Sequence, residues 1–263
     1  MALNMRQRAR LSRGIQYAIF AIIVIVLIVV VDWKTFVDAF LNPKVIAEQF
    51  PGVLTIALKN TIIYTALGFV LALAMGIVLA LMKISSVGPY RWIATGYIEF
   101  FRGVPALIVF IAFGLGIPTA FGFSLNTYLT VMLSLGIVES AYIAETLRAG
   151  LQAVPRGQYE AARSLGMTHT RAMISIIIPQ AFRIILPPLT NEIIMMTKDS
   201  SLIFLVGLSA KQYELALFGQ NGITEPSAGL TPLVVSGACY LVITLPLGWL
   251  ARRFEARTAK MRK

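Results

Sequence analysis

The feature that most constrains this chain is a series of apolar segments long enough to cross a lipid bilayer. The first, Ile15–Val31, carries no charge, and its 17 residues are just long enough to span a hydrocarbon core. A cleaved signal peptide would have a shorter apolar region and an Ala-x-Ala site, which does not precede Asp32, so we expect a retained span. Further spans are expected at residues 53–82, 97–118, 125–150, 172–201 and 233–250. Together they predict an all-α membrane protein with six transmembrane helices.

The charged residues predict how these spans are oriented. Only 13% of the residues are charged, against about 25% in soluble domains, and the mean hydropathy is +0.78. With both termini in the cytoplasm, as six spans require, most of the 23 Lys and Arg residues fall on the cytoplasmic side, as the positive-inside rule expects. The exceptions are Lys34, Lys44, Lys59, Lys198 and Lys211. The net charge of +11 therefore marks a cytoplasmic face, and we expect no nucleic-acid partner.

The counts of two residue types exclude common site chemistries. The single Cys, Cys239, rules out an intrachain disulfide and a Cys-based metal site. The single His, His169, argues against a His-based metal site or a catalytic triad. Because no set of nucleophile, base and metal ligands stands out, we expect neither an enzyme nor a metal site.

Small residues predict how the second span packs. Gly68, Ala72, Gly76 and Ala80 recur at every fourth position and form one smooth stripe on a helix. Another helix can approach such a stripe closely. We expect that helix to belong to the same subunit.

Prolines predict an irregular fifth span. Pro179, Pro187 and Pro188 each lack a backbone N–H, so a helix is expected to bend or break there. Broken backbone at membrane depth is tolerated only where protein or a wet cavity covers it.

The connection between the fourth and fifth spans, Glu160–Pro179, carries more sequence signals for a defined structure than a cytoplasmic loop usually does. Helix-forming residues precede Gly166, which suits the left-handed position just past a helix end, and Thr168 is placed to cap the next helix. We therefore expect a short helix, a glycine turn and a second helix. Ala161 and Ala162 give the first helix a small face that suits a groove in a partner protein. The alternative is a helix resting on lipid headgroups, for which two alanines are a poor anchor.

This connection resembles the EAA loop of ABC-importer permeases, in which Glu-Ala-Ala is followed at fixed spacing by Gly, Ile and Leu-Pro. The matching residues are Glu160, Ala161, Ala162, Gly166, Ile176 and Pro179. Ile178 replaces the leucine of the family pattern. The segments IEFFRGVP, ESAYIAETLRAG, LPPLTNE and KDSSL resemble those of the polar-amino-acid class of these permeases, and the resemblance covers about residues 55–253.

The resemblance implies a type I ABC-importer permease bundle with a defined domain organisation. Residues 51–263 would form the permease core, with a cytoplasmic coupling loop at about residues 151–175. Residues 1–50 would add a basic N-terminus, an extra span and an external loop, because the family minimum has five spans. The implied location is the bacterial inner membrane, which the chain would cross several times.

The same resemblance implies the partners. The helix that carries Glu160, Ala161 and Ala162, ended by Gly166, would dock in a cleft of a cytoplasmic ATPase dimer and pass ATP-driven closure to the membrane domain. A second permease chain, identical or related, would complete the pathway, and an extracytoplasmic binding protein would deliver a polar amino acid. The chain has no P-loop pattern, so ATP and Mg²⁺ would bind in the ATPase and this chain would need no cofactor.

Charged and polar residues within the spans are candidates for the substrate pathway. An intramembrane charge costs roughly 2.5–3.5 kcal/mol on insertion scales and usually faces a pathway or a partner. An amino-acid zwitterion needs acceptors for its ammonium group and donors for its carboxylate. The candidates are Glu139, Ser140, Tyr142, Asn191, Glu192, Lys198 and Asp199. The alternative is a structural role, such as an ion pair between Glu192 and Lys198.

Two pairs of opposite charges stand three residues apart in the chain. They are Glu99 with Arg102 and Glu145 with Arg148. This spacing places both members of a pair on one face of a helix. We therefore expect each Glu to pair with its Arg.

A second function class stays open, a secondary transporter or channel driven by an ion gradient. It would explain the prolines of the fifth span and the intramembrane Glu139. Many such folds have repeated halves, which this sequence does not show. Transport under a proton or sodium gradient without an ATPase would favour it.

Overall fold

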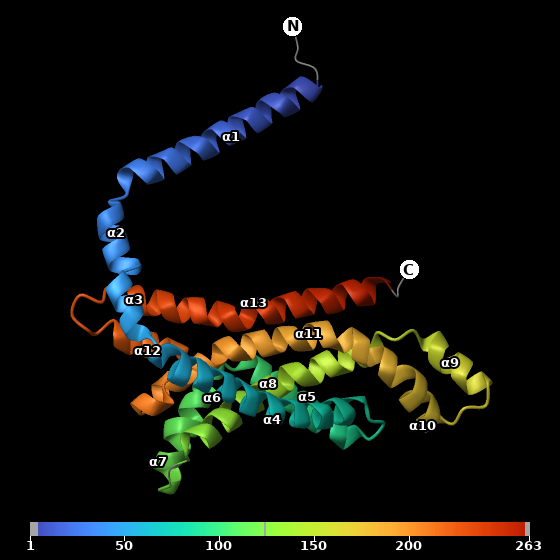
Figure 1. Ribbon diagram of the computed structural model, residues 1–263. Helices are drawn as coiled ribbons and strands as arrows, with labels where there is room; N and C mark the ends of the chain where they lie inside the picture. The colour runs from blue at the N-terminus through green and yellow to red at the C-terminus, as the bar shows by residue number, and fades with distance from the viewer. Residues whose placement is uncertain (1–4, 124, 261–263) are drawn as a thin grey trace.

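The computed structural model describes residues 5–123 and 125–260, and the long elements in this part of the chain are all helices (Figure 1). Residues 1–4, 124 and 261–263 lie outside the described residues, and with them the basic residues Arg262 and Lys263, which are expected on the cytoplasmic side. The helices long and apolar enough to cross a membrane are Ser12–Val30, Val53–Ile84, Thr127–Gln152, His169–Val206 and Thr231–Thr258. A bent pair, Gly88–Gly103 with Ala106–Phe121, makes a sixth candidate. The all-α fold is thereby confirmed, with five candidate spans, or six if the bent pair forms one span.

The first helix, α1 (Met5–Val30), extends away from the bundle (Figure 1). None of its most apolar window is buried by the rest of the described chain. Two short helices connect it to the bundle, α2 (Trp33–Phe40) and α3 (Pro43–Gln49). The Leu230 N–H donates to the Ala39 carbonyl at 2.7 Å, so this connection is held at the start of the last long helix.

The centre of the bundle is the pair α4 (Lys59–Ile84) and α8 (Thr127–Gln152). A Cβ atom added at Gly68 would lie 2.6 Å from Leu135 Cδ2, and one added at Gly76 would lie 2.7 Å from Ile143 Cγ2. The two helices therefore approach more closely than any larger residue at these positions would permit. The prediction that the small stripe packs within one subunit is confirmed.

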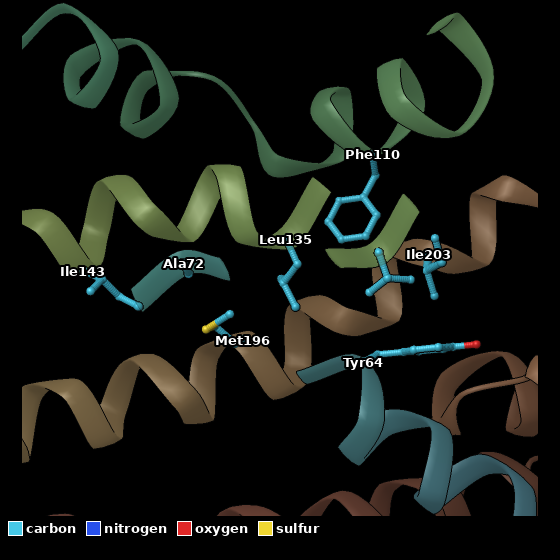
Figure 2. Close-up of a cluster of buried hydrophobic side chains, with 8 residues drawn as sticks. Tyr64, Ala72, Phe110, Leu135, Ile143, Met196 and Ile203 are labelled. Carbon is cyan, nitrogen blue, oxygen red and sulfur yellow. The ribbon is translucent and has the colours of Figure 1, made fainter. Parts of the chain in front are cut away.

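Large apolar side chains fill the space around this pair (Figure 2). They come from α4, α8 and two later segments, α11 (Ile178–Asp199) and the 3₁₀ turn η4 (Ser200–Val206), and Phe110 joins them from the third span. The cluster consists of Tyr64, Ala72, Phe110, Val131, Leu135, Ile143, Met196 and Ile203. Since all are at most 1% exposed, this core fixes α8 and α11 relative to each other.

The third expected span is not one continuous helix. It divides into α5 (Gly88–Gly103) and α6 (Ala106–Ile111), with a bend of 100° between them. Pro105 stands at the bend, and the residue before a proline is disfavoured in the helical region. The chain then continues through the π turn η2 (Ala112–Gly116) and α7 (Ile117–Phe121).

The fifth span does not break at its prolines, so of the two expected outcomes, a bend or a break, the break does not occur. Pro187 and Pro188 lie inside α11, and Pro179 occupies its first turn. Pro187 leaves the carbonyl of Arg183 without its helical donor, and the Thr258 hydroxyl donates to that oxygen at 3.1 Å. A neighbouring helix thus supplies the bond that the proline removes, which explains why the helix continues.

Polar side chains fix the connection after η4 at one end of the bundle. It contains the 3₁₀ turn η5 (Ala210–Gln212) and α12 (Leu215–Gly222), and it leads to α13 (Thr231–Lys260). Glu214 caps α12 and is fully buried, and the Tyr240 hydroxyl donates to its carboxylate at 2.9 Å. Burial raises the pKa of the Glu214 carboxyl above its usual value.

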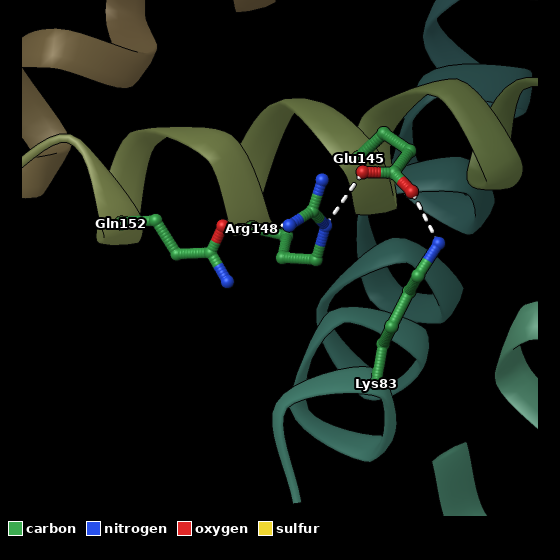
Figure 3. A network of polar contacts seen from close by, with 4 residues as sticks. All are labelled: Lys83, Glu145, Arg148 and Gln152. Atoms are coloured by element: carbon green, nitrogen blue, oxygen red, sulfur yellow. Dashed lines mark hydrogen bonds and ion pairs between the residues drawn. The ribbon is translucent and has the colours of Figure 1, made fainter.

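An ion-pair network joins α4 and α8 at the other end (Figure 3). Arg148 Nε donates to Glu145 Oε2 at 2.6 Å, and Lys83 pairs with the other oxygen of Glu145. Arg148 also donates to the Gln152 side chain at 2.6 Å. The expected pairing of Glu145 with Arg148 is confirmed.

Candidate functional site

The loop that the sequence singled out is a rigid helix–turn–helix. It consists of α9 (Arg156–Ser164), a turn at Gly166, and α10 (His169–Ala172), which continues through the π turn η3 (Met173–Ile177) into α11. Gly166 has a φ of +82°, as expected for the left-handed residue after a helix. The Gly166 N–H donates to Arg163 O at 3.0 Å and the Met167 N–H to Ala162 O at 3.1 Å, which is the Schellman pattern.

Side chains hold the two short helices at a fixed angle. The Thr168 hydroxyl accepts from the Arg171 N–H at 3.3 Å and caps α10, as predicted. Tyr159 and His169 form a hydrogen bond at 2.9 Å across the turn. The loop lies at the end of the bundle that also carries the α4–α5 turn and the C-terminal end of α13 (Figure 1). These three segments, all expected on the cytoplasmic side, therefore share one end of the bundle.

The faces of α9 differ from the expected arrangement in one respect. Glu160 and Ala161 are exposed, but Ala162 is 5% exposed and packs inside the chain. The chain itself therefore covers Ala162, and the prediction that its side chain faces a partner groove is wrong. Leu165, at the tip of the loop, is 85% exposed and is the apolar side chain most available to a partner.

A second candidate site is a cavity of about 150 Å³ where the α5–α6 bend meets α8 and α11. Its lining consists of Val104, Ala106, Val138, Glu139, Tyr142, Glu192, Met195 and Asp199. The bend supplies Val104 and Ala106, so the cavity exists because the third span is not straight. Glu139, which projects from α8, is only 4% exposed.

Three carboxyl groups line the cavity, and one of them contacts a neighbouring hydroxyl. Glu139 comes from α8, whereas Glu192 and Asp199 come from α11. Glu192 accepts from the Thr146 hydroxyl at 3.2 Å. Within the described residues, no group of three or more His, Cys, Asp and Glu side chains is arranged to hold a metal ion. The cavity is therefore an acidic, hydrogen-bonding pocket that can accept a cationic group.

Three of the candidate pathway residues do not line this cavity. Ser140 is fully buried and hydrogen-bonded, at 2.9 Å to the Tyr97 hydroxyl and at 2.7 Å to the Ile137 carbonyl. Asn191 and Lys198 are exposed on α11. The alternative pairing of Glu192 with Lys198 is not seen, because Thr146 is the partner of Glu192.

One charged residue at the cavity was missed by the sequence analysis. The guanidinium carbon of Arg102 lies 5.6 Å from the centroid of the Tyr142 ring, so Arg102 stacks on a lining residue. Its sequence neighbour Val104 also lines the cavity. The signal that could have found it is the position of Arg102 two residues before Val104, close to the bend at Pro105.

Comparisons with known proteins agree with this architecture. Residues 72–260 match the family model described as "Binding-protein-dependent transport system inner membrane component". A probable glutamine ABC transporter permease protein of Bacillus subtilis is 36% identical over 201 residues, which cover 75% of this chain and 91% of that protein. An arginine transport system permease protein of the same organism is 33% identical over 207 residues, covering 78% and 90%.

A solved structure gives the same result for the fold. The crystal structure of an amino acid ABC transporter with histidines contains a chain 37% identical to this one, with a TM-score of 0.70, covering 80% of this chain and 96% of that chain. The helical loop, the multi-span bundle and these relatives agree with the resemblance found in the sequence. The chain belongs to the family of binding-protein-dependent transport system inner membrane components, the multi-pass membrane permease subunits of ABC importers.

Proposed function

We propose that this permease imports polar amino acids, and that it prefers those with a positively charged side chain. The acidic cavity carries the proposal, since Glu139, Glu192 and Asp199 converge there and its lining contains no Lys or Arg. A buried carboxylate attracts an ammonium or guanidinium group far more strongly than water-exposed groups attract each other, because the local dielectric constant is low. The named substrates of the relatives, glutamine and arginine, belong to the proposed class.

Arg102 gives the proposed site a positive charge beside its carboxyl groups. An amino acid also carries a carboxylate, and a guanidinium binds a carboxylate through two parallel hydrogen bonds. Arg102 is exposed and stacks on Tyr142, so its side chain is held beside the cavity while its donors remain accessible. A substrate could place its cationic side chain among the carboxyl groups and its carboxylate against Arg102.

The α9–α10 loop is the proposed coupling element. In this proposal α9 docks in a cytoplasmic ATPase dimer, and Glu160, Ala161 and Leu165 form the contact. Ala162 and Gly166 set the position of the helix. ATP and Mg²⁺ bind in the ATPase, a second permease chain completes the pathway, and an extracytoplasmic binding protein delivers the substrate at the end that carries α12.

Transport assays with the purified complex test this function against the ion-gradient alternative. The permease, its ATPase and a second permease chain, if one co-purifies, are reconstituted into liposomes with radiolabelled arginine. We expect uptake that requires ATP and the binding protein, and competition in the order arginine, then glutamine, then glutamate. Uptake under a proton or sodium gradient without the ATPase would contradict the proposed class, and stronger competition by glutamate than by arginine would contradict the proposed substrate.

A further inference from the structure

A basic cleft lies between α11 and α13, away from the substrate cavity and next to the start of α9. It consists of two adjoining pockets of about 280 and 360 Å³, which share Arg183 and Thr258. Among the described residues, the lining is Ala153, Pro155, Gln158, Gln180, Arg183, Ile184, Leu186, Phe254, Arg257 and Thr258. These residues, here called the α11–α13 cleft, include two arginines and two amide side chains but no Asp or Glu.

The floor of the cleft is held in place by a hydrogen bond between the two helices. Pro187 frees the carbonyl of Arg183, and the Thr258 hydroxyl donates to it at 3.1 Å. The same hydroxyl lies 3.1 Å from its own helical partner, the Phe254 carbonyl. The backbone positions of Arg183 and Arg257 are therefore fixed relative to each other, on neighbouring helices.

The cleft lies at the level where a membrane span ends. The candidate span in α13 runs from Thr231 to Thr258, so the cleft opens beside its last turn. Two turns earlier, Trp249 is 56% exposed, and the guanidinium carbon of Arg253 lies 5.2 Å from its ring centroid. Trp and Arg at the end of a span are typical of the boundary between hydrocarbon and headgroups.

The lining combines the two properties of a lipid-binding surface. Arg183 and Arg257 are exposed, and a guanidinium group is well suited to bind a phosphate. Leu186 and Phe254 are partly buried and provide an apolar surface beside them. A free phosphate ion would use only the arginines, whereas a phospholipid would use both the arginines and the apolar wall.

We propose that the α11–α13 cleft binds the headgroup phosphate of an anionic phospholipid. Basic pockets between transmembrane helices on the cytoplasmic side are suited to such headgroups. The site is separate from the substrate cavity, and it borders the α9–α10 loop only through Pro155 and Gln158 at the start of α9. Its test therefore needs no transport activity, and its failure would leave the proposed function intact.

Native mass spectrometry of the detergent-purified permease measures lipid binding directly. The protein is titrated with phosphatidylglycerol or with phosphatidylcholine of the same acyl chains, and bound lipids are counted. We expect wild type to retain phosphatidylglycerol preferentially. Arg183→Gln with Arg257→Gln should lower that retention by about tenfold, because both phosphate ligands are removed. Arg91→Gln with Arg252→Gln removes the same charge outside the cleft and should leave retention unchanged.

A charge-conserving pair distinguishes a lost lipid site from a misfolded protein. Arg183→Lys with Arg257→Lys keeps both charges and should restore most of the binding. Unchanged retention in the glutamine pair, or equal loss in the control pair, would overturn the proposal. Displacement of the lipid by inorganic phosphate would overturn it in favour of a cleft that binds phosphate alone. If the glutamine pair instead lost the ATPase and kept its lipid, the cleft would belong to a protein interface.

Discussion

At the scale of single residues, the cavity depends on where each carboxyl group is held. Glu139 projects from the centre of α8 and is 4% exposed, so its charge cannot be solvated by bulk water. Asp199 terminates α11 and Glu192 lies two turns earlier on the same helix. A cationic ligand that enters between α8 and α11 would stabilise these carboxyl groups in place of the water that burial removes.

The first prediction concerns Glu139. Glu139→Gln keeps the volume and a hydrogen-bonding group but removes the charge, so the fold should survive. The apparent KM for arginine uptake should rise by about tenfold or more, because one partner of a buried charge pair is lost. ATP hydrolysis by the assembled complex should persist.

A matched control for this prediction is Asn191→Ala. Asn191 is polar, exposed and outside the cavity, so uptake kinetics should be unaltered. If Glu139→Gln transports arginine with the wild-type KM, Glu139 has a structural role only and the cavity is not the substrate site.

The sequence identifies the residue types of the cavity but cannot tell which of them meet. Spacing along one helix places Glu139 and Tyr142 near each other, yet it cannot show that Asp199 of another helix lines the same cavity. Ser140 is a candidate by its position next to Glu139, but its hydroxyl bonds to the Tyr97 side chain. The three-residue spacing predicts that Arg102 pairs with Glu99, whereas Arg102 stacks on Tyr142 of a different helix.

At the scale of elements, close contact between α4 and α8 is the main determinant of the bundle. Gly68 lies against Leu135, and Gly136 of the facing helix lies against Leu71, where an added Cβ would be 2.7 Å from Leu71 Cδ2. The contact is therefore reciprocal, with a glycine of each helix receiving a leucine of the other. Ion pairs at the end of α8 then fix how far the two helices are shifted along each other (Figure 3).

The second prediction compares two glycines in helix interiors. Gly68→Ala should lower the free energy of unfolding of the purified permease by about 1–3 kcal/mol, because the new methyl group would overlap Leu135. Gly96→Ala is the control, since nothing lies within 4 Å of the added Cβ in α5. Gly96→Ala should be neutral or stabilising, because alanine is the better helix former. Thermal unfolding measures both variants, and equal melting temperatures would contradict the close packing of α4 on α8.

The sequence predicts the elements well where the signal is local and less well where a neighbouring helix decides. The α9–Gly166–α10 loop follows from a glycine and a cap within a few residues, and it forms as expected. The prolines of α11 predict a bend or a break in the helix, but it does not break, because Thr258, far away in the sequence, satisfies the freed carbonyl of Arg183. Similarly, the burial of Ala162 depends on how α9 packs against the bundle, which no local pattern reports.

At the scale of the whole molecule, the chain consists of a packed bundle and an unpacked N-terminal helix. The family match begins within α4 and leaves α1 outside it. α1 contributes nothing to the cavity lining and buries none of its apolar window. Its exposed side chains can be covered by lipid or by another chain of the complex.

The third prediction concerns this helix. Deleting residues 1–31 should lower the abundance or assembly of the complex while the apparent KM for the substrate stays at its wild-type value. Quantitative blotting of membranes and uptake by the assembled fraction measure the two quantities separately. A raised KM at normal abundance would show that the N-terminal helix takes part in the pathway.

The central claim is that the α9–α10 loop transmits ATP-driven closure to the bundle, and the ATPase retained by a tagged permease tests it most directly. Leu165→Asp places a charge on the exposed tip of the loop, where burial in a partner cleft would be costly. Ser86→Asp adds the same charge at the α4–α5 turn, at the same end of the bundle. With both variants at wild-type levels in the membrane, we predict that Leu165→Asp loses the ATPase and ATP-dependent uptake and that Ser86→Asp keeps both. Full ATPase retention and uptake with Leu165→Asp would contradict the claim.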